Sequence, residues 1–181
     1  RFENSVTSKD LFAMAEGLAD IVVEHHARRL KNRARRITID LDPTDDPTHG
    51  AQQLTFFNAH YHCFCYLPMI GTLQFNSENE KYLFAAVLRP GNAHSSRGAI
   101  GILSRIIPRV RAAFPKTRIR VRLDGGFGSP DILDYLDDEG VEYIVGYASN
   151  SVLVSKAKKV MGMMRALSMI SNKTETIFSE F

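Results

Sequence analysis

The sequence predicts an α/β fold, in which a mixed β-sheet is flanked by helices and a further helix lies at the N-terminal end. Two patterns support this prediction. Short runs such as RITIDLD and RIRVRL alternate apolar and polar residues, which is typical of strands with one buried face. Longer segments repeat apolar residues at helical spacing, as at Leu103, Ile107 and Val110. With 181 residues, 44% of them hydrophobic, the chain is long enough for one domain of ordinary size.

Each predicted element follows from a local signal. The first helix has apolar residues at helical spacing, namely Leu11, Met14, Leu18, Ile21 and Val22. Ser129-Pro130 is a typical helix start, and Gly140 a typical helix end. In chain order we expect a helix over 8–30, strands over 36–42, 61–74 and 82–89, a helix ending at Phe114, a strand over 118–123, a helix from Pro130, a strand over 141–147 and a helix over 151–168.

The order of these elements predicts how the strands pair. The first three strands are close in the sequence and can pair antiparallel, whereas crossover helices separate the later strands, which should be parallel. Three antiparallel strands followed by parallel strands is the order of the ribonuclease-H-like mixed sheet. We expect an N-terminal helical segment with a basic end at residues 1–34, and the ribonuclease-H-like core at residues 35–181.

Basic residues gather in two clusters, although the net charge is only +3. The clusters precede two predicted strands, while residues 37–60 contain four Asp and no Lys or Arg. Basic clusters beside an acidic centre suit a polyanion such as double-stranded DNA. The alternative is a solvated helix face with structural arginines. The predicted DNA-binding residues are Arg28, Arg29, Lys31, Arg33, Arg35, Arg36, Arg105 and Arg109.

Acidic residues stand where two of the predicted strands end. Asp40 and Asp42 share one face of the first strand, and Asp124 directly follows a later one. If these strands are neighbours, the carboxylates meet at one edge of the sheet and can bind Mg²⁺ or Mn²⁺. Such metals activate a water or a 3′-hydroxyl for attack on a phosphodiester. Arg120 and Arg122 share the strand face of Asp124, so we expect them to be partly buried partners of the acidic cluster.

The remaining composition bears on the setting of the protein. Cys63 and Cys65 lie two residues apart on a predicted strand, where they cannot easily bond each other, which suggests a reducing, cytoplasmic environment. No apolar run approaches the roughly 20 residues of a membrane span, so no membrane partner is expected. The chain starts at Arg1 without a signal peptide, and we expect it to be a piece of a longer protein.

Four segments, in order over residues 37–150, resemble the DDE-type transposases of bacterial insertion sequences. They are DLDPTDDPTHGAQ, HCFCYLPMI, LRPGNAHSS and RIRVRLDGGFGSPDILDYLDDEGVEYIVGYASN. That family opens its catalytic domain with an Asp-x-Asp-x-Thr-Asp-Asp segment followed by His-Gly. It then carries Tyr-Leu-Pro, Leu-Arg-Pro-Gly-Asn and Arg-x-Asp-Ser-Gly-Phe segments. This sequence has Gly125 where the family commonly has Ser.

The resemblance implies a ribonuclease-H-like fold and a metal-dependent enzyme that hydrolyses DNA at insertion-sequence ends and joins them to a target. It implies that Asp124 and either Asp42 or Asp40 are catalytic ligands of Mg²⁺ or Mn²⁺. The family's third acid, a Glu, is expected beyond Phe181, so we expect this chain alone to be inactive. The implied partners are transposon-end DNA, target DNA and a second transposase chain, at the bacterial nucleoid. Two alternatives stay open: a ribonuclease-H-like nuclease without strand transfer, and a non-catalytic truncated product that binds DNA.

Overall fold

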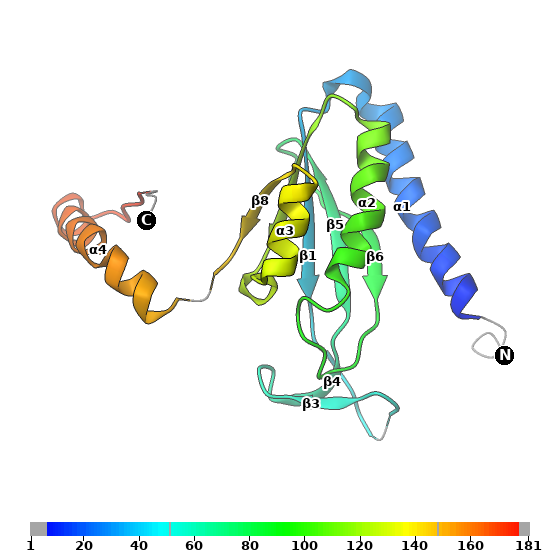
Figure 1. Ribbon diagram of the computed structural model, residues 1–181, viewed down its shortest axis with the longest axis horizontal. Coiled ribbons are helices and arrows are strands. Elements are labelled where there is room, and N and C mark those ends of the chain that lie inside the picture. The colour runs from blue at the N-terminus through cyan, green and yellow to red at the C-terminus, as the bar shows by residue number, and fades with distance from the viewer. Residues whose placement is uncertain (1–6, 51, 148, 178–181) are drawn as a thin grey trace. The chain divides into compact units, whose positions relative to one another are not determined.

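The protein is described by a computed structural model covering residues 7–50, 52–147 and 149–177 (Figure 1). Contacts divide the chain into two compact units, Arg1–Gly146 and Tyr147–Phe181. Both β-sheets and three of the described helices belong to the first unit, and the last helix belongs to the second. The predicted division into residues 1–34 and 35–181 stays a prediction.

A five-stranded mixed sheet forms the centre of the first unit. Its strand order is β6-β5-β1-β7-β8. The central strand β1 pairs antiparallel with β5, which pairs antiparallel with β6, while β1, β7 and β8 run parallel. This arrangement confirms the predicted ribonuclease-H-like order of three antiparallel strands followed by parallel ones. The strands are β1 (Arg36–Pro43), β5 (Met69–Phe75), β6 (Tyr82–Val87), β7 (Arg118–Leu123) and β8 (Glu142–Val145).

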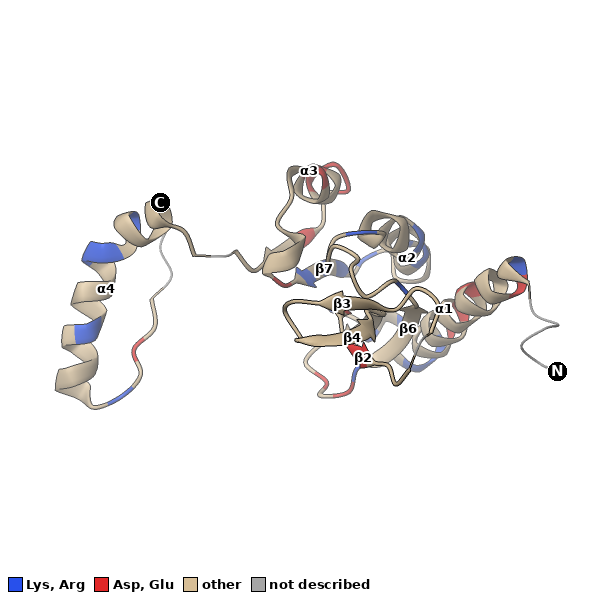
Figure 2. Ribbon diagram, turned by 90° about the horizontal axis from the view of Figure 1, so that it is seen from below, with Lys and Arg blue, Asp and Glu red and all other residues tan. Residues whose placement is uncertain are grey.

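One face of this sheet carries the hydrophobic core. Ile37, Ile39 and Leu41 of β1 are at most 2% exposed and pack with apolar side chains from the helices. Figures 1 and 2 show that all three helices of this unit lie over the same face. The helices are α1 (Ser8–Leu30), α2 (Ala99–Ala113) and α3 (Pro130–Asp138), with short 3₁₀ turns at Lys31–Arg33 and Gly125–Phe127. The opposite face therefore receives the alternate residues of β1, which include Asp40 and Asp42.

Helix α1 has the predicted bounds but a different buried face. Its start is fixed by a capping box, in which Thr7 and Asp10 exchange hydrogen bonds with each other's backbone N–H groups. The buried residues are Ala19, Val23, His26 and Leu30, whereas the predicted residues Leu11, Met14 and Ile21 are mostly exposed.

A second, three-stranded sheet stands at the end of the first unit toward which β1 points (Figure 1). Its order is β2-β4-β3, from Asp46–Pro47, Cys63–Tyr66 and Phe56–Asn58. The single strand predicted over 61–74 is therefore wrong, because the chain changes sheets at Leu67-Pro68, between β4 and β5. Buried Arg89 holds this bend: its Nε donates to the Leu67 carbonyl at 2.9 Å, and its Nη1 donates to three carbonyls of residues 94–97.

The second unit consists of helix α4 (Ser151–Ser171) and the residues around it. The Asn150 side chain caps the helix by accepting from the Leu153 N–H at 2.9 Å. None of its described residues is buried. No helix in the described ranges combines the length and the apolar character needed to cross a lipid bilayer.

Candidate functional site

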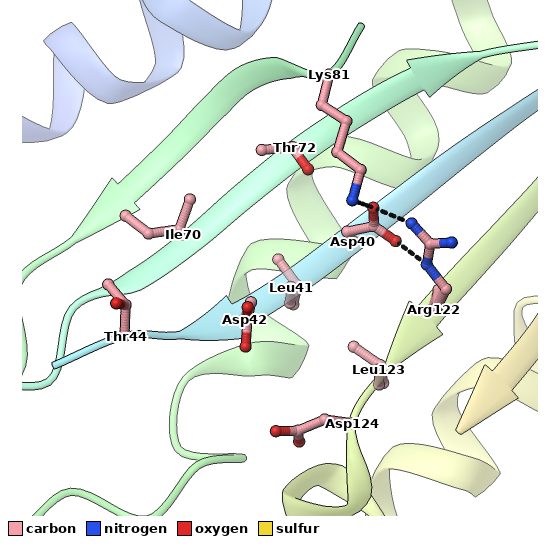
Figure 3. A pocket seen from close by; sticks show the side chains of 10 residues that line it. All are labelled: Asp40, Leu41, Asp42, Thr44, Ile70, Thr72, Lys81, Arg122, Leu123 and Asp124. Atoms are coloured by element: carbon pink, nitrogen blue, oxygen red, sulfur yellow. Dashed lines mark hydrogen bonds and ion pairs between the residues drawn. The ribbon is translucent and has the colours of Figure 1, made fainter. Parts of the chain in front are cut away.

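Asp42 and Asp124 come from neighbouring parallel strands. The β1–β7 ladder ends with Leu41 opposite Leu123, so Asp42 and Asp124 are the next residues of the two strands. Neighbouring strands lie about 4.8 Å apart. Figure 3 shows both carboxylates beside the same cavity, at the carboxyl end of the parallel strands. The structure therefore brings together the two acidic sites that the sequence predicts to meet.

An open cavity of about 610 Å³ contains these carboxylates on the sheet face opposite the helices. Its charged residues come from four places: β1, the residue before β6, β7 and the turn after β7. The acids of the cavity repel a polyanion such as a nucleic-acid backbone. Such a ligand can enter only if neighbouring cations offset the negative charge of these acids. The lining residues are Asp40, Leu41, Asp42, Thr44, Ile70, Thr72, Lys81, Arg122, Leu123 and Asp124.

Asp40 is held by two cations. Arg122 donates from Nε and Nη2 to the two oxygens of Asp40, each at 2.7 Å, and Nζ of Lys81 lies 3.0 Å from Oδ2 (Figure 3). Burial opposes ionisation of Asp40, but the hydrogen bonds and charges of Arg122 and Lys81 outweigh it and lower its pKa. The predicted pairing of Arg122 with the acidic cluster is thus confirmed. Arg120 instead binds Glu142 of β8 at 2.9 Å.

Asp42 has the opposite electrostatic environment. Partial burial in the cavity raises the pKa of its carboxyl, and the negative charge of Asp124 raises it further, while Lys81 opposes these effects. Asp124 accepts a hydrogen bond from the Gly126 N–H at 2.9 Å, which fixes the turn after β7. No hydrogen bond or ion pair of the Asp42 side chain is found among the described residues. Asp40 and Asp42 are therefore distinguishable: one carboxylate is neutralised, and the other is left beside a like charge.

The site contains two neighbouring groups that the sequence did not indicate. Lys81 precedes β6 and reaches the cavity across β5, a position that only the sheet order reveals. The Tyr61 hydroxyl donates to the Pro43 carbonyl at 3.4 Å, and burial followed by the charges of nearby acids, Asp42 and Asp124 among them, raises its pKa. Within the described ranges, no group of three or more His, Cys, Asp or Glu residues could hold a metal ion.

The predicted DNA-binding residues do not line the cavity. The first cluster lies at the end of α1 and the start of β1, and Arg36 is six residues, about 20 Å of strand, from Asp42. The second is engaged with α1: Arg105 lies 3.1 Å from Glu16, and Arg109 binds Glu16 and Asp20 at 2.8 and 2.7 Å. These residues therefore lie away from the cavity, because sequence proximity to a strand does not give proximity to its far end, and their role in DNA binding stays a prediction.

Comparison with known proteins adds to this geometry. The family described as "Transposase DDE domain group 1" matches residues 1–181. The chain belongs to this family. No curated protein sequence matches it.

Solved structures similar to this DDE domain include those of Mos1 transposase. A Mos1 paired-end complex with the left transposon end is 14% identical, with a TM-score of 0.38, and the match covers 91% of this chain and 49% of that one. The Mos1 catalytic domain with raltegravir and Mn is 13% identical, with a TM-score of 0.36, covering 92% and 74%. The domain thus spans about half the length of the longer Mos1 chain.

Proposed function

We propose that this chain supplies the part of a DNA transposase catalytic domain that carries two catalytic carboxylates, Asp42 and Asp124. The whole enzyme would cleave phosphodiester bonds at insertion-sequence ends and join the freed 3′ ends to target DNA. The observation that carries the proposal is the meeting of these two acids at the ends of adjacent parallel strands, where no ion pair to either is found in the described part of the chain. Membership of the DDE domain family supports the same reaction.

Asp42 and Asp124 fit a divalent metal ion. Mg²⁺ is commonly held by one or two carboxylates, with waters and substrate phosphates completing its coordination. Burial raises the pKa of Asp42, and the negative charge of Asp124 raises it further; a divalent cation would relieve this repulsion between the two carboxylates. When bound, Mg²⁺ or Mn²⁺ supplies activation of the attacking oxygen and stabilisation of the leaving oxygen. Asp40 is not proposed as a ligand, because Arg122 and Lys81 already occupy its oxygens.

The proposal assigns two of the three acids of a DDE site to this chain. Since no third metal-binding side chain joins them among the described residues, we expect the 181-residue chain to nick DNA very slowly. Double-stranded DNA and a second transposase chain are the proposed partners. The exposed residues Arg28, Lys31, Arg33 and Arg35 remain the candidates for phosphate contacts outside the cavity.

Thermal unfolding with and without Mn²⁺ tests the assignment of the carboxylates. At a free metal concentration ten times Kd, binding stabilises the folded protein by about 1.4 kcal/mol. We expect wild type to show this stabilisation, and Asp42→Asn and Asp124→Asn to lose it. Asp46→Asn is the matched control, because it is the same substitution at an aspartate that does not line the cavity. Full retention of the Mn²⁺ effect in both site variants would contradict the proposed metal site.

A plasmid-nicking assay tests the expected low activity of the isolated chain. We expect little metal-dependent nicking by wild type and none by Asp124→Ala. Rapid nicking that Asp124→Ala abolishes would show that a residue of this chain completes the catalytic site, and the assignment of only two acids would then be wrong.

A further inference from the structure

Lys81 and Arg122 bring more positive charge to the cavity than is needed to neutralise the Asp40 carboxylate. Arg122 alone contacts both oxygens of Asp40, and Lys81 adds a second cation to a carboxylate that is already paired. The three side chains, named here the Lys81–Asp40–Arg122 cluster, therefore carry one net positive charge. A second exposed ion pair contributes only about 0–1 kcal/mol to stability. Folding alone thus gives little reason for Lys81 to be there.

Both cations remain accessible from the cavity. Their side chains are 48% and 46% exposed, whereas that of Asp40 is 13% exposed. Arg122 uses Nε and Nη2 for Asp40, so Nη1 lies outside the bidentate pair. The Lys81 ammonium has three donors, and one contact to Asp40 is found. Asp40 thus holds two partly exposed cations in place without occupying all of their hydrogen-bond donors.

The cluster is close to the carboxylate pair but separate from it. Asp40 and Asp42 are two residues apart on β1, which corresponds to about 6.6 Å along the strand. Each strand of duplex DNA carries one phosphate per about 3.4 Å of helix axis. If one phosphate of a DNA strand lies at Asp42 and Asp124, another phosphate of the same DNA strand, one or two nucleotides away, would be within reach of Lys81 and Arg122.

We propose that Lys81 and Arg122, positioned by Asp40, form a binding subsite for a DNA phosphate next to the one held at the carboxylate pair. This inference rests on the proposed function, and it adds the residues that hold the DNA strand inside the cavity. A phosphate that entered without this subsite would meet only acids among the charged residues of the cavity. Asp40 is a positioning residue in this arrangement, because it acts through the two cations.

Duplex binding as a function of salt tests the subsite, with a short labelled duplex of arbitrary sequence in the presence of Mg²⁺. Each phosphate contact contributes about −0.9 to the log–log slope, so its loss costs about eightfold in affinity near 0.1 M salt. We expect Lys81→Gln to make the slope shallower by about 0.9, and Lys81→Arg to restore it. Lys9→Gln is the matched control, because Lys9 lies in the first turn of α1, on the helix side of the sheet. It should bind as wild type does.

Thermal unfolding verifies that each variant is folded. We expect all of them to fold, because the ion pair between Asp40 and Arg122 is retained in each. A folded Lys81→Gln with the wild-type slope, or a Lys81→Arg as weak as Lys81→Gln, would overturn the subsite and leave the carboxylate assignment intact. Wild type that binds no duplex at all would overturn the subsite and the DNA-binding part of the proposed function together. If Mn²⁺ does not stabilise wild type, the proposed metal site is contradicted, while the phosphate subsite is not.

Discussion

Removing Arg122 should destabilise the protein more than removing the charge of its partner Asp40. In Arg122→Met, the Asp40 carboxylate stays in a position where its side chain is only 13% exposed, with Lys81 as its remaining cation. In Asp40→Asn, the freed guanidinium is 46% exposed and can be hydrated. The group left behind determines the cost of breaking an ion pair, because an uncompensated buried charge is unfavourable.

The sizes of these effects follow from the exposure of the two partners. Breaking a fully buried pair costs about 3–5 kcal/mol. Because the pair is partly exposed and Lys81 remains, we expect about 2 kcal/mol for Arg122→Met and about 1 kcal/mol for Asp40→Asn. The double variant should lose no more than about 2 kcal/mol in total, since it also removes the unpaired Asp40 charge and changes at contacting residues are not additive.

Urea unfolding followed by tyrosine fluorescence measures these differences. With a slope near 2 kcal/mol per molar urea, Arg122→Met should lower the midpoint by about 1 M. Arg118→Met is the control on the same strand face: its side chain is 70% exposed and lies 3.6 Å from Glu142. If Arg122→Met costs no more than Arg118→Met, or if the two changes at the pair are additive, Asp40 is not held as described and becomes a candidate metal ligand again.

Three further predictions concern pH, charge repulsion and packing. The folded-state pKa of Asp40 is lowered, so its ion pairs stabilise the protein above about pH 4 and lose this effect as the pH falls through the folded value. Acid unfolding of Asp40→Asn should depend less steeply on pH than that of wild type. Asp124→Asn removes the repulsion acting on Asp42, so in EDTA at neutral pH it should raise the free energy of unfolding slightly, by less than about 1 kcal/mol; a decrease would contradict the repulsion. Gly91→Ala should cost about 1–3 kcal/mol in urea unfolding, because the added Cβ would overlap the Cys65 carbonyl oxygen. An unaffected midpoint would exclude this close approach.

Local patterns were sufficient to predict the large sheet. The alternation of apolar and polar residues in Arg36–Pro43 and Arg118–Leu123 indicates strands with one buried face. The crossover helices between strands predict that these two strands are parallel. The same patterns could not give the buried face of α1, since that depends on what the helix meets. His26 stacks on Phe75 with ring centroids 4.1 Å apart, a contact between residues distant in the sequence.

The small sheet and the choice between two acids also needed the fold. Residues 61–74 look like one continuous strand, but Arg89 holds the bend at Leu67 through the backbone of a later segment. Asp40 and Asp42 occupy equivalent positions in the alternating pattern of β1. What distinguishes them are Arg122 on the neighbouring strand β7 and Lys81, which reaches across β5; both contact Asp40.

The charged pairs on the face opposite the helices also act as an alignment code for the parallel strands. Asp40 stands opposite Arg122 on β7, and Arg120 stands opposite Glu142 on β8. Side chains alternate between faces, so a shift of β7 by one residue would put an apolar side chain opposite Asp40 and send the arginines into the hydrophobic core. A shift by two residues would keep the faces but leave Asp40 opposite Arg120 or Asp124. A shift by one residue in either direction, or a shift by two that brings Asp124 opposite Asp40, thus loses the pairing of Asp40 with an arginine, whereas the observed alignment keeps it and sets Asp42 beside Asp124.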